Sequence, residues 1–281
     1  MAKALVVFDF DETLIDCDSD YWVVEQLGVN DTFLQLLPTL PLNSIMDQMM
    51  TELHSRKKTI QDIAECLIQV PFHSKILSAI KSAYASGGDL RIVSDANTFF
   101  IETILEKHGI IGCFSEIHTN PSYVDEEGRL KILQYHDSKS SSHGCSICPP
   151  NMCKGLVMER IRTSVRSEGK KRFIYVGDGT PDFCATLKLE EGDFVMPRKN
   201  FPLCDFIYGN GNKNLIKANI QEWSDGEELS TNLLNAINTI IIQEDYNVRP
   251  DDPLVPLDCK FQTSSISAFD VCTRNPLPIP R

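Results

Sequence analysis

The sequence has no long hydrophobic run and no excess of basic residues. No apolar stretch approaches the roughly 20 residues that a membrane-spanning helix needs. The 39 aspartates and glutamates outnumber the 27 lysines and arginines, which leaves a net charge of −12 over 281 residues. Binding to a nucleic-acid backbone or an anionic membrane requires a clustered basic face, so we expect neither as a partner. The amino terminus lacks the basic-then-apolar layout of a signal peptide, and we expect a cytoplasmic location.

Glycine-rich nucleotide-binding loops are missing as well. The chain has 15 glycines, but they form neither the G-x-G-x-x-G fingerprint of dinucleotide binding nor a Walker-type phosphate loop. The stretch Gly177-Asp178-Gly179 is too short to be either. We also find no internal repeat. These absences argue against a nucleotide-cofactor enzyme and against a repeat architecture.

Clustered cysteines are scarce, although the chain has ten cysteines in all. Most of them stand singly in apolar or tail sequence, and in a reducing compartment such residues are expected to be buried free thiols. These single cysteines are Cys17, Cys66, Cys113, Cys184, Cys204, Cys259 and Cys272. The scattered pattern therefore predicts no disulfide framework.

The exception is one short segment that carries three cysteines and a histidine. His143, Cys145, Cys148 and Cys153 have the ligand chemistry of a Cys3His zinc site, and C-x-x-C is the spacing expected for one ligand hairpin. The four residues are compressed into eleven positions, however, instead of forming two separated pairs. We therefore favour a structured thiol loop without metal. The alternative is a structural zinc ion that would position Lys154.

Three apolar runs of β-forming residues indicate a parallel sheet. They cover residues 4–10, 90–94 and 173–177, and each is followed by a helical pattern. Strands that alternate with helices predict an α/β fold with a doubly wound parallel sheet. In such a sheet, ligands bind beyond the carboxyl ends of the strands, where Asp9, Asp95 and Asp178 are expected to lie.

The segment 16–85 has mostly helical periodicity and is longer than a simple crossover between parallel strands. Its apolar stripes, which we expect to pack on one another, are Ile45, Met46, Met49, Met50 and Leu53, and Ile60, Ile63, Ala64 and Leu67. We predict that 16–85 is a small helical cap inserted after the first strand of a core formed by 1–15 and 86–245. Residues 114–133 are predicted to be extended around a turn at 125–128, and the proline-rich segment 246–281 to be a disordered tail.

The sequence that ends the first run contains two aspartates two residues apart, Asp9 and Asp11. In extended backbone this spacing would put both carboxylates on one face, where their repulsion needs a cation or a cationic substrate to offset it. Acids often begin the loops that follow strands, so the pair could also be a simple loop start. The pattern nevertheless favours a functional site.

Further polar residues follow the same logic at the other predicted strand ends. Ser94 could donate a hydroxyl to a phosphoryl oxygen, Lys154 opens a predicted helix, and Asp178 and Asp182 supply two more carboxylates. Each has an ordinary structural reading, as a helix cap, a surface charge, a turn residue or a first-turn acid. Their joint placement at strand ends favours a single site.

These motifs resemble those of the haloacid dehalogenase (HAD) superfamily of aspartate-nucleophile phosphatases. The matching stretches are DFDET from Asp9 to Thr13, SDAN from Ser94 to Asn97, CKG around Lys154, and GDGTPD from Gly177 to Asp182. The chain is more closely similar to the phosphoethanolamine/phosphocholine phosphatase family, which includes plant members acting on thiamine monophosphate or pyrophosphate. That resemblance runs from about residue 4 to 225 and is carried by VFDFDETLID, DSDYWV, RIVSDANTFFIE, CPPNMCKG and VMPRKNFPL.

The resemblance implies a HAD-like sheet and a set of residue roles. Asp9 would be the nucleophile, and Asp11 would protonate the leaving oxygen and then activate water. Mg²⁺ would be held by the Asp9 carboxylate, the Asp11 backbone carbonyl and Asp178, with Asp182 as a direct or more distant acid. Ser94 and Lys154 would hold the phosphoryl oxygens.

The resemblance also associates Asp20 and Asp95 with the cationic head of an amino-alcohol phosphate. Carboxylates near an ammonium group, with Tyr21 or Trp22 as an aromatic face, make a cation pocket physically reasonable. In the simpler reading, Asp20 caps a helix that begins at Tyr21.

The leading hypothesis is a Mg²⁺-dependent phosphatase for thiamine monophosphate, phosphocholine or phosphoethanolamine. The alternatives are an inorganic pyrophosphatase on the same site and a non-catalytic phosphoryl-binding module. A dehalogenase is disfavoured because that chemistry does not need Asp11.

Overall fold

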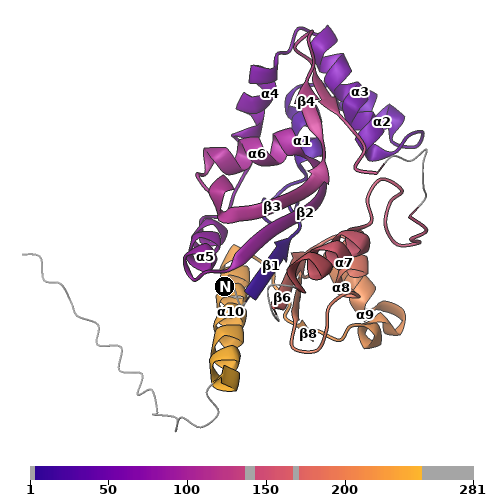
Figure 1. The fold of residues 1–281 in the computed structure, drawn as a ribbon. Coiled ribbons are helices and arrows are strands. Elements are labelled where there is room, and N and C mark those ends of the chain that lie inside the picture. The colour runs from indigo at the N-terminus through magenta and orange to yellow at the C-terminus, as the bar shows by residue number, and fades with distance from the viewer. Residues whose placement is uncertain (1–3, 137–142, 167–170, 249–281) are drawn as a thin grey trace, which may run out of the picture.

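A six-stranded parallel sheet forms the centre of the molecule (Figure 1). The computed structural model describes residues 4–136, 143–166 and 171–248. The strand order is β3-β2-β1-β6-β7-β8, and every neighbouring pair is parallel. The strands are β1 Ala4–Phe8, β2 Asp89–Asn97, β3 Phe114–Asn120, β6 Arg172–Gly177, β7 Phe194–Pro197 and β8 Asn219–Ile220.

The strand order reverses at β1. The chain proceeds from β1 through β2 to β3 on one side and then continues from β6 to β8 on the other. Val6 in the middle of β1 is in register with Leu90 of β2 and with Ile174 of β6. A reversal of this kind opens a crevice at the carboxyl ends of the strands, which is where ligands bind in open α/β sheets.

Helices cover both faces of the sheet because both faces of β1 are apolar. Val6 and Phe8 belong to one buried cluster and Leu5 and Val7 to another, as expected from the two-residue period of a strand. On the Val6 side lie α5 Ser74–Ala85, α6 Thr98–Lys107 and α10 Gly226–Val248. On the Leu5 side lie α7 Lys154–Val165 and α8 Thr180–Thr186. The α/β prediction is confirmed.

Shorter elements complete the part of the chain around and after the sheet. The helix α9 Pro202–Tyr208 packs against α8 and buries Leu203 and Ile207 against Phe183. The 3₁₀ helices are η1 Ile111–Cys113 and η3 Gly209–Leu215.

The segment between β1 and β2 is helical, as predicted. Its first four helices are α1 Ser19–Gln26, α2 Asn30–Leu36, α3 Leu42–Ser55 and α4 Ile60–Leu67. They lie beyond the carboxyl ends of the strands, together with the hairpin formed by β4 Ser122–Val124 and β5 Leu130–Ile132 (Figure 1). The fifth helix, α5, instead packs against α10 and β2. The division into core and cap at residue 85 stays a prediction.

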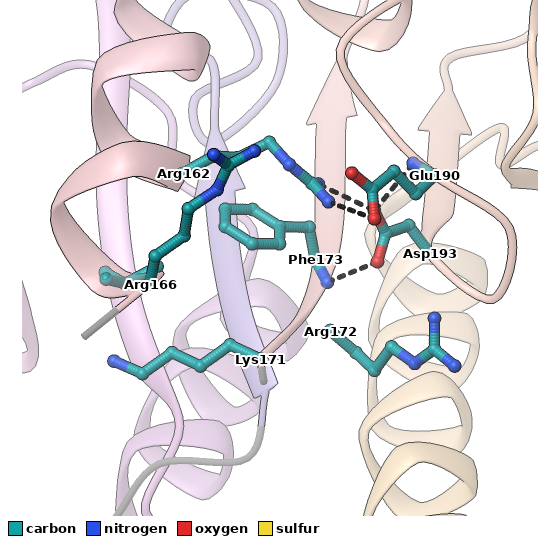
Figure 2. A pocket seen from close by; sticks show the side chains of 8 residues that line it. Arg162, Arg166, Lys171, Arg172, Phe173, Glu190 and Asp193 are labelled. Carbon is teal, nitrogen blue, oxygen red and sulfur yellow. Dashed lines mark hydrogen bonds and ion pairs between the residues drawn. The ribbon is translucent and has the colours of Figure 1, made fainter. Parts of the chain in front are cut away.

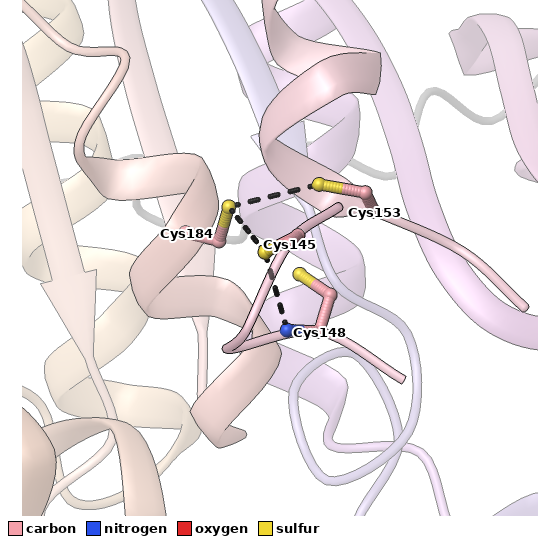
Figure 3. A group of neighbouring side chains, drawn as sticks. All are labelled: Cys145, Cys148, Cys153 and Cys184. Atoms are coloured by element: carbon pink, nitrogen blue, oxygen red, sulfur yellow. Dashed lines mark hydrogen bonds between the residues drawn. The ribbon is translucent and has the colours of Figure 1, made fainter. Parts of the chain in front are cut away.

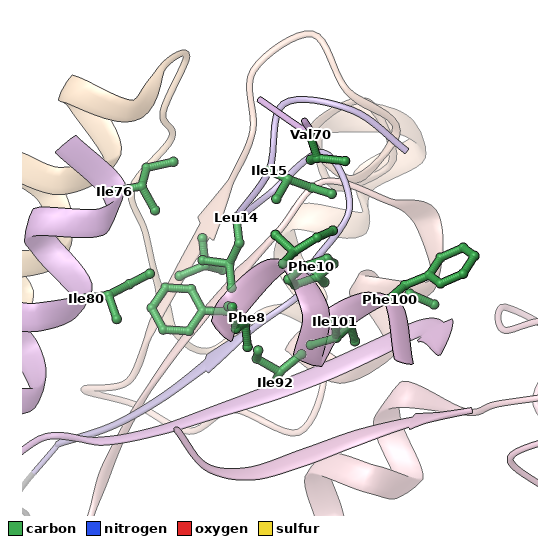
Figure 4. Packing of buried hydrophobic residues seen from close by; sticks show 14 of the residues in the cluster. Phe8, Phe10, Leu14, Ile15, Val70, Ile76, Ile80, Ile92, Phe100 and Ile101 are labelled. Atoms are coloured by element: carbon green, nitrogen blue, oxygen red, sulfur yellow. The ribbon is translucent and has the colours of Figure 1, made fainter. Parts of the chain in front are cut away.

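One buried cluster joins these cap helices to the sheet. The predicted stripe of Ile45, Met46, Met49, Met50 and Leu53 is buried, and it belongs to the same cluster as Phe8, Phe10 and Leu14. In Figure 4, Phe8 and Phe10 lie between side chains of α5 and α6. Because packing in such a cluster is close, the cap helices are placed relative to the ends of the strands by ordinary apolar contacts.

Several smaller predictions can be compared with the structure. Extended backbone over 114–133 is confirmed by β3, β4 and β5. The predicted tail begins too early, because α10 continues to Val248, and residues 249–281 lie outside the described part. None of the helices in the described ranges combines the length and the apolar character that a membrane span needs.

Substitution of Ile80 by alanine tests the packing of α5 against the sheet. Ile80 is fully buried in the large cluster (Figure 4), so removing its side chain leaves a cavity. We expect Ile80→Ala to lower the free energy of unfolding by about 2–5 kcal/mol. Lys81→Ala, one position along the same helix but exposed, is the matched control. Equal denaturation midpoints for the two variants would contradict this account of the core.

Candidate active site

Asp9 and Asp11 follow the central strand at the point where the sheet order reverses. The strand β1 ends at Phe8, and the chain then turns, with the backbone N–H of Leu14 donating to the Phe10 carbonyl at 2.8 Å. Strand pairing still reaches Asp9, whose N–H donates to the Val176 carbonyl at 2.9 Å, and the turn begins after it. Both aspartate side chains line one cavity.

This cavity has a volume of about 190 Å³ and lies at the carboxyl ends of β1, β2 and β6. We call it the acidic cavity, because seven of its lining residues are acids and Lys154 is the one base among the described residues that line it. Its lining residues are Asp9, Asp11, Glu12, Asp18, Asp20, Leu42, Asp95, Ala96, Lys154, Asp178, Gly179 and Pro181. Leu42, at the start of α3, brings the cap helices to the cavity wall.

Lys154 connects two of the carboxylates. Its Nζ lies 2.6 Å from Asp9 Oδ2 and 2.8 Å from Asp182 Oδ1, and its side chain is only 3% exposed. As predicted, Lys154 is the first residue of a helix, α7. Its position at the helix start, beside the end of β1, lets a buried ammonium group reach the strand-end carboxylates.

Asp182 anchors the loop that carries Asp178. Its Oδ2 accepts hydrogen bonds from the backbone N–H groups of Asp178 at 3.1 Å and Gly179 at 2.9 Å. Its Oδ1 accepts from the Tyr175 hydroxyl at 2.6 Å as well as from Lys154. Because both oxygens are engaged, Asp182 is better suited to holding this loop and Lys154 than to binding a metal directly.

Burial sets the charge balance of the cluster. Desolvation, followed by the Asp182 carboxylate, raises the pKa of Asp9 well above its usual value, although Lys154 opposes that shift. The same two causes raise the pKa of Asp178 to about 7. Burial alone would lower the pKa of Lys154, but the Asp182 and Asp9 carboxylates raise it well above its usual value, so the amine stays protonated. The carboxylates need a further cation to remain ionised together.

Asp11 has the electrostatic surroundings of a general acid. Burial, followed by the carboxylates of Asp18 and Asp20, raises the pKa of Asp11 well above its usual value. The backbone N–H of Ser19 donates to Asp11 Oδ1 at 3.0 Å and holds the side chain in place. A carboxyl group whose pKa is raised holds its proton more readily and can donate it to a leaving oxygen.

Asp20 lies in the first turn of α1 without capping it. Asp18 is the cap, because its Oδ1 accepts from the Tyr21 N–H at 2.9 Å, so the simpler reading of Asp20 is wrong. Asp20 is 5% exposed, and its Oδ1 has no hydrogen-bond partner among the described residues. Burial, then the carboxylates of Asp18 and Asp95, raises the pKa of Asp20 well above its usual value.

The suggested aromatic face does not reach this cavity. Tyr21 is partly exposed and contacts Phe33, with ring centroids 4.9 Å apart. Trp22 Nε1 donates to the Cys66 carbonyl at 3.1 Å. Neither ring is among the described residues that line the acidic cavity. The carboxyl groups of Asp18, Asp20 and Asp95, and not an aromatic ring, therefore line this end of the cavity.

Ser94 and Asp95 lie within β2 and not after it, because the strand continues to Asn97. Adjacent strand residues point to opposite sides, and of these two only Asp95 lines the acidic cavity. Ser94 is fully buried, and its Oγ accepts from the Ala96 N–H at 3.2 Å. A contact between Ser94 and a phosphoryl oxygen therefore stays a prediction.

The strand-end residues have the donor chemistry for a hard divalent cation. Carboxylate oxygens of Asp9, Asp178 and Asp182 lie within 4.8 Å of one another in a buried setting. With Lys154 protonated, the three carboxylates leave two negative charges in excess, which one divalent ion would balance. Oxygen ligands of this kind suit Mg²⁺. The residues present therefore fit the predicted metal.

Three residues that support the site escaped the sequence reasoning. Thr13 donates its hydroxyl to Asp178 Oδ1 at 2.8 Å, and Tyr175 donates to Asp182. Arg198 donates to the backbone carbonyl of Glu12 at 2.5 Å, where the chain has a positive φ of 53°. All three stand inside or beside the quoted motifs, Arg198 within VMPRKNFPL, so their position in the sequence was a usable signal. Arg198 is 186 residues from its partner, and only the fold brings the two together.

A second cavity, with a larger volume of about 310 Å³, lies at the opposite end of the strands, near their amino ends (Figure 2). It includes Arg172 and Phe173 at the amino end of β6, away from the strand ends that bind ligands. Its central base, Arg162, is bound to Asp193 at 2.8 Å and to Glu190 at 3.0 Å. The acidic cavity therefore remains the candidate active site.

The reversed parallel sheet, the strand-end aspartates and the buried lysine define a phosphatase of the HAD superfamily. A family model described as "Putative Phosphatase" matches residues 4–237, and the chain belongs to this family. The non-catalytic alternative is disfavoured by this membership and by the intact set of strand-end acids.

Curated relatives and solved structures agree with this class. The chain is 52% identical over 263 residues to "Inorganic pyrophosphatase 2" of Arabidopsis thaliana, a match that covers 93% of each chain. It is 54% identical over 246 residues to "Thiamine phosphate phosphatase-like protein" of the same plant, covering 87% of this chain and 100% of the relative. A substrate-bound phosphoserine phosphatase shares the fold, with a TM-score of 0.52 and 17% identity. The match covers 82% of this chain and 99% of the phosphoserine phosphatase.

Gly177→Ala tests the role of Asp182 as an anchor. A Cβ at position 177 would lie 2.6 Å from Asp182 Oδ2, so Asp182 must move and release Lys154 or the Asp178 loop. We expect kcat/KM to fall at least about 10-fold, a loss of about 1.4 kcal/mol in transition-state stabilisation. The control is Gly112→Ala, because a Cβ there meets nothing within 4 Å. Phosphate-release kinetics that do not separate the two variants would refute the anchor.

Proposed function

We propose that the chain is a Mg²⁺-dependent phosphatase for small phosphorylated metabolites with a cationic head. Candidate substrates are thiamine monophosphate, phosphocholine and phosphoethanolamine. The observation that carries the proposal is the buried Asp20 Oδ1, which has no hydrogen-bond partner in the described part of the chain and lines a cavity rich in acids. A buried carboxylate left without a partner is costly, and an ammonium group on the substrate would offset that cost.

In the proposed reaction, Asp9 attacks phosphorus and forms an aspartyl-phosphate. The Phe10 N–H donates to Asp9 Oδ1 at 2.8 Å, and Lys154 contacts Oδ2, so the nucleophile is held from both oxygens. The fixed geometry lowers the entropic cost of reaching the transition state. The ammonium group of Lys154 also lies where negative charge develops during phosphoryl transfer.

Asp11 has two successive tasks in this scheme. Its raised pKa suits it to protonate the leaving oxygen, and the resulting carboxylate then takes a proton from the water that hydrolyses the aspartyl-phosphate. Asp9, Asp178 and the Asp11 backbone carbonyl would hold Mg²⁺, with Asp182 behind them. When bound, this ion would neutralise charge on the carboxylates and on the phosphoryl oxygens.

Asp11→Asn separates the two tasks of Asp11. With phosphocholine, whose leaving oxygen needs a proton, we expect turnover to fall by about 10²- to 10⁴-fold. With p-nitrophenyl phosphate, a better leaving group, the first step needs less acid catalysis, so a burst of about one nitrophenol per chain precedes a stall. Rapid-mixing kinetics measure the burst, and intact-protein mass spectrometry detects the trapped phosphoryl group. Equal losses on both substrates without a burst would contradict the assigned role.

Pyrophosphate is the second candidate substrate, because relatives that are 52% identical carry the name inorganic pyrophosphatase. Pyrophosphate has no cationic group and would enter an acidic cavity with one lysine, so it would need divalent ions for charge balance. The two candidates therefore make opposite demands on Asp20. An amine phosphate gains from its negative charge, whereas pyrophosphate does not.

A phosphate-release panel with and without Mg²⁺ tests these candidates. It compares thiamine monophosphate, phosphocholine, phosphoethanolamine, pyrophosphate and a sugar phosphate, with Asp9→Asn as the blank. Removing the negative charge of Asp20 removes its Coulombic attraction for the cationic head, which at about 4 Å amounts to roughly 1–4 kcal/mol depending on solvent screening. We therefore expect Asp20→Asn to lower kcat/KM for the amine phosphates by about 10- to 100-fold and to leave pyrophosphate hydrolysis unimpaired.

Asp31→Asn is the control, since it makes the same change at an exposed position of α2 that does not line the cavity. Efficient pyrophosphate hydrolysis in both variants, with weak turnover of every amine phosphate, would select the second candidate. Wild-type turnover by Asp9→Asn would overturn the proposed nucleophile.

A further inference from the structure

Four cysteines from two separate segments meet beside the active site. Cys145 and Cys148 come from the loop before α7, Cys153 immediately precedes α7, and Cys184 projects from α8 (Figure 3). Their sulfur atoms lie within 4.8 Å of one another. Cys148, Cys153 and Cys184 are buried, and Cys145 is partly buried. The sequence pattern contained only three of them, because Cys184 follows Cys153 by 31 residues.

Cys184, and not His143, completes the set. His143 Nε2 lies 2.9 Å from the Pro149 carbonyl oxygen, and its Nδ1 accepts the Cys145 N–H at 3.2 Å. Both ring nitrogens are thus engaged by the backbone of the loop. The Cys3His set considered from the sequence is therefore replaced by a set of four thiols, whose fourth member comes from a distant helix.

The spacing of the sulfurs matches a tetrahedral metal site. Zinc–thiolate bonds of about 2.3 Å put the four sulfurs of a tetrahedron about 3.8 Å apart. Cys184 Sγ lies 3.6 Å from Cys145 Sγ and 3.7 Å from Cys153 Sγ. A disulfide would require about 2.05 Å instead. The Cys184 sulfur is also close to both Cys145 and Cys153, an arrangement that suits a metal ion bound by all of them better than a disulfide between two of them.

The surrounding backbone is arranged to receive negative charge on sulfur. The N–H groups of Ile147 and Cys148 both approach Cys145 Sγ at 3.4 Å. A Cβ at Gly155 would lie 2.5 Å from Cys184 Sγ, so glycine there allows α7 and α8 to approach closely enough for the sulfurs to meet.

We propose that Cys145, Cys148, Cys153 and Cys184 bind one Zn²⁺ ion in a structural tetrathiolate site. Four protein ligands leave no open position for substrate, which is the pattern of structural and not catalytic zinc. Each thiol that enters as a thiolate releases one proton to solvent, and no oxidant or reductant is needed. Zinc affinity should accordingly fall as the pH falls.

The site would fix two parts of the phosphatase machinery relative to each other. Cys153 adjoins Lys154, and Cys184 stands two residues after Asp182. Cys148 Sγ also lies 3.6 Å from the Pro181 carbonyl oxygen, in the loop between Asp178 and Asp182. A bound ion would thus link the helix that begins with Lys154 to the helix that contains Asp182.

Metal analysis of the full-length protein, expressed and purified with reductant and without chelator, tests the proposal. We expect about one zinc per chain by inductively coupled plasma mass spectrometry. After replacement by Co²⁺, we expect the visible bands of a tetrahedral ion and intense thiolate-to-cobalt charge-transfer absorption. Asp178→Asn, which alters the predicted Mg²⁺ site, should retain the zinc. These readouts do not depend on phosphatase activity, so a failed substrate assignment would leave them unchanged.

Three variants locate the ion. Cys184→Ser should lose the stoichiometric zinc, whereas Cys204→Ser, a buried cysteine outside the cluster, and His143→Ala should keep it. If Cys184→Ser fails to fold, the wild-type zinc content and cobalt spectrum still decide. Absence of stoichiometric zinc, iron in its place, a disulfide within the cluster, or loss of zinc in His143→Ala but not in Cys184→Ser would each overturn the proposal.

Discussion

The rest of the site depends on one constraint, which is that three carboxylates are buried together beside a single ammonium group. Asp9, Asp178 and Asp182 approach one another at the strand ends, and Lys154 bridges two of them at 2.6 and 2.8 Å. Like charges in a buried place are unfavourable unless a cation offsets them. Lys154 and the hydroxyl and backbone N–H groups that contact the carboxylates stabilise the cluster in the folded chain. The negative charge that remains is what a divalent ion would balance.

Acids from the start of α1 and from β2 extend this constraint across the acidic cavity. Asp18, Asp20 and Asp95 face the same cavity, and the raised pKa of Asp20 results from burial followed by these neighbours. A cavity of this charge favours partners that are positive or that arrive with metal. The relatives named as a pyrophosphatase and as a thiamine phosphate phosphatase-like protein have similar identities to the chain, at 52% and 54%. Relatives with different names are thus equally similar to the chain, so the fold alone does not choose between the candidate substrates.

The fold was predictable because its signals are local. Apolar β-forming runs gave β1, β2 and β6, and helical stripes such as Met46, Met49 and Met50 gave α3, since burial on one face imposes a short period. Boundaries were less predictable. β2 extends past Ser94 to Asn97 because pairing with β3 continues there, and α10 runs to Val248. Both extensions depend on what the element packs against, which no short window of sequence contains.

By itself, the sequence determined which chemical groups stand at the strand ends and that Asp9, Asp11, Lys154 and Asp178 follow one another in a phosphatase order. It could not determine which atoms touch. Only the tertiary structure decided that Asp182 holds Lys154 and the Asp178 loop, and that Cys184 joins the other cysteines in place of His143. The physical reason is that these contacts join residues brought together by the packing of α7 and α8 on the sheet, whereas sequence patterns report only what neighbours along the chain impose.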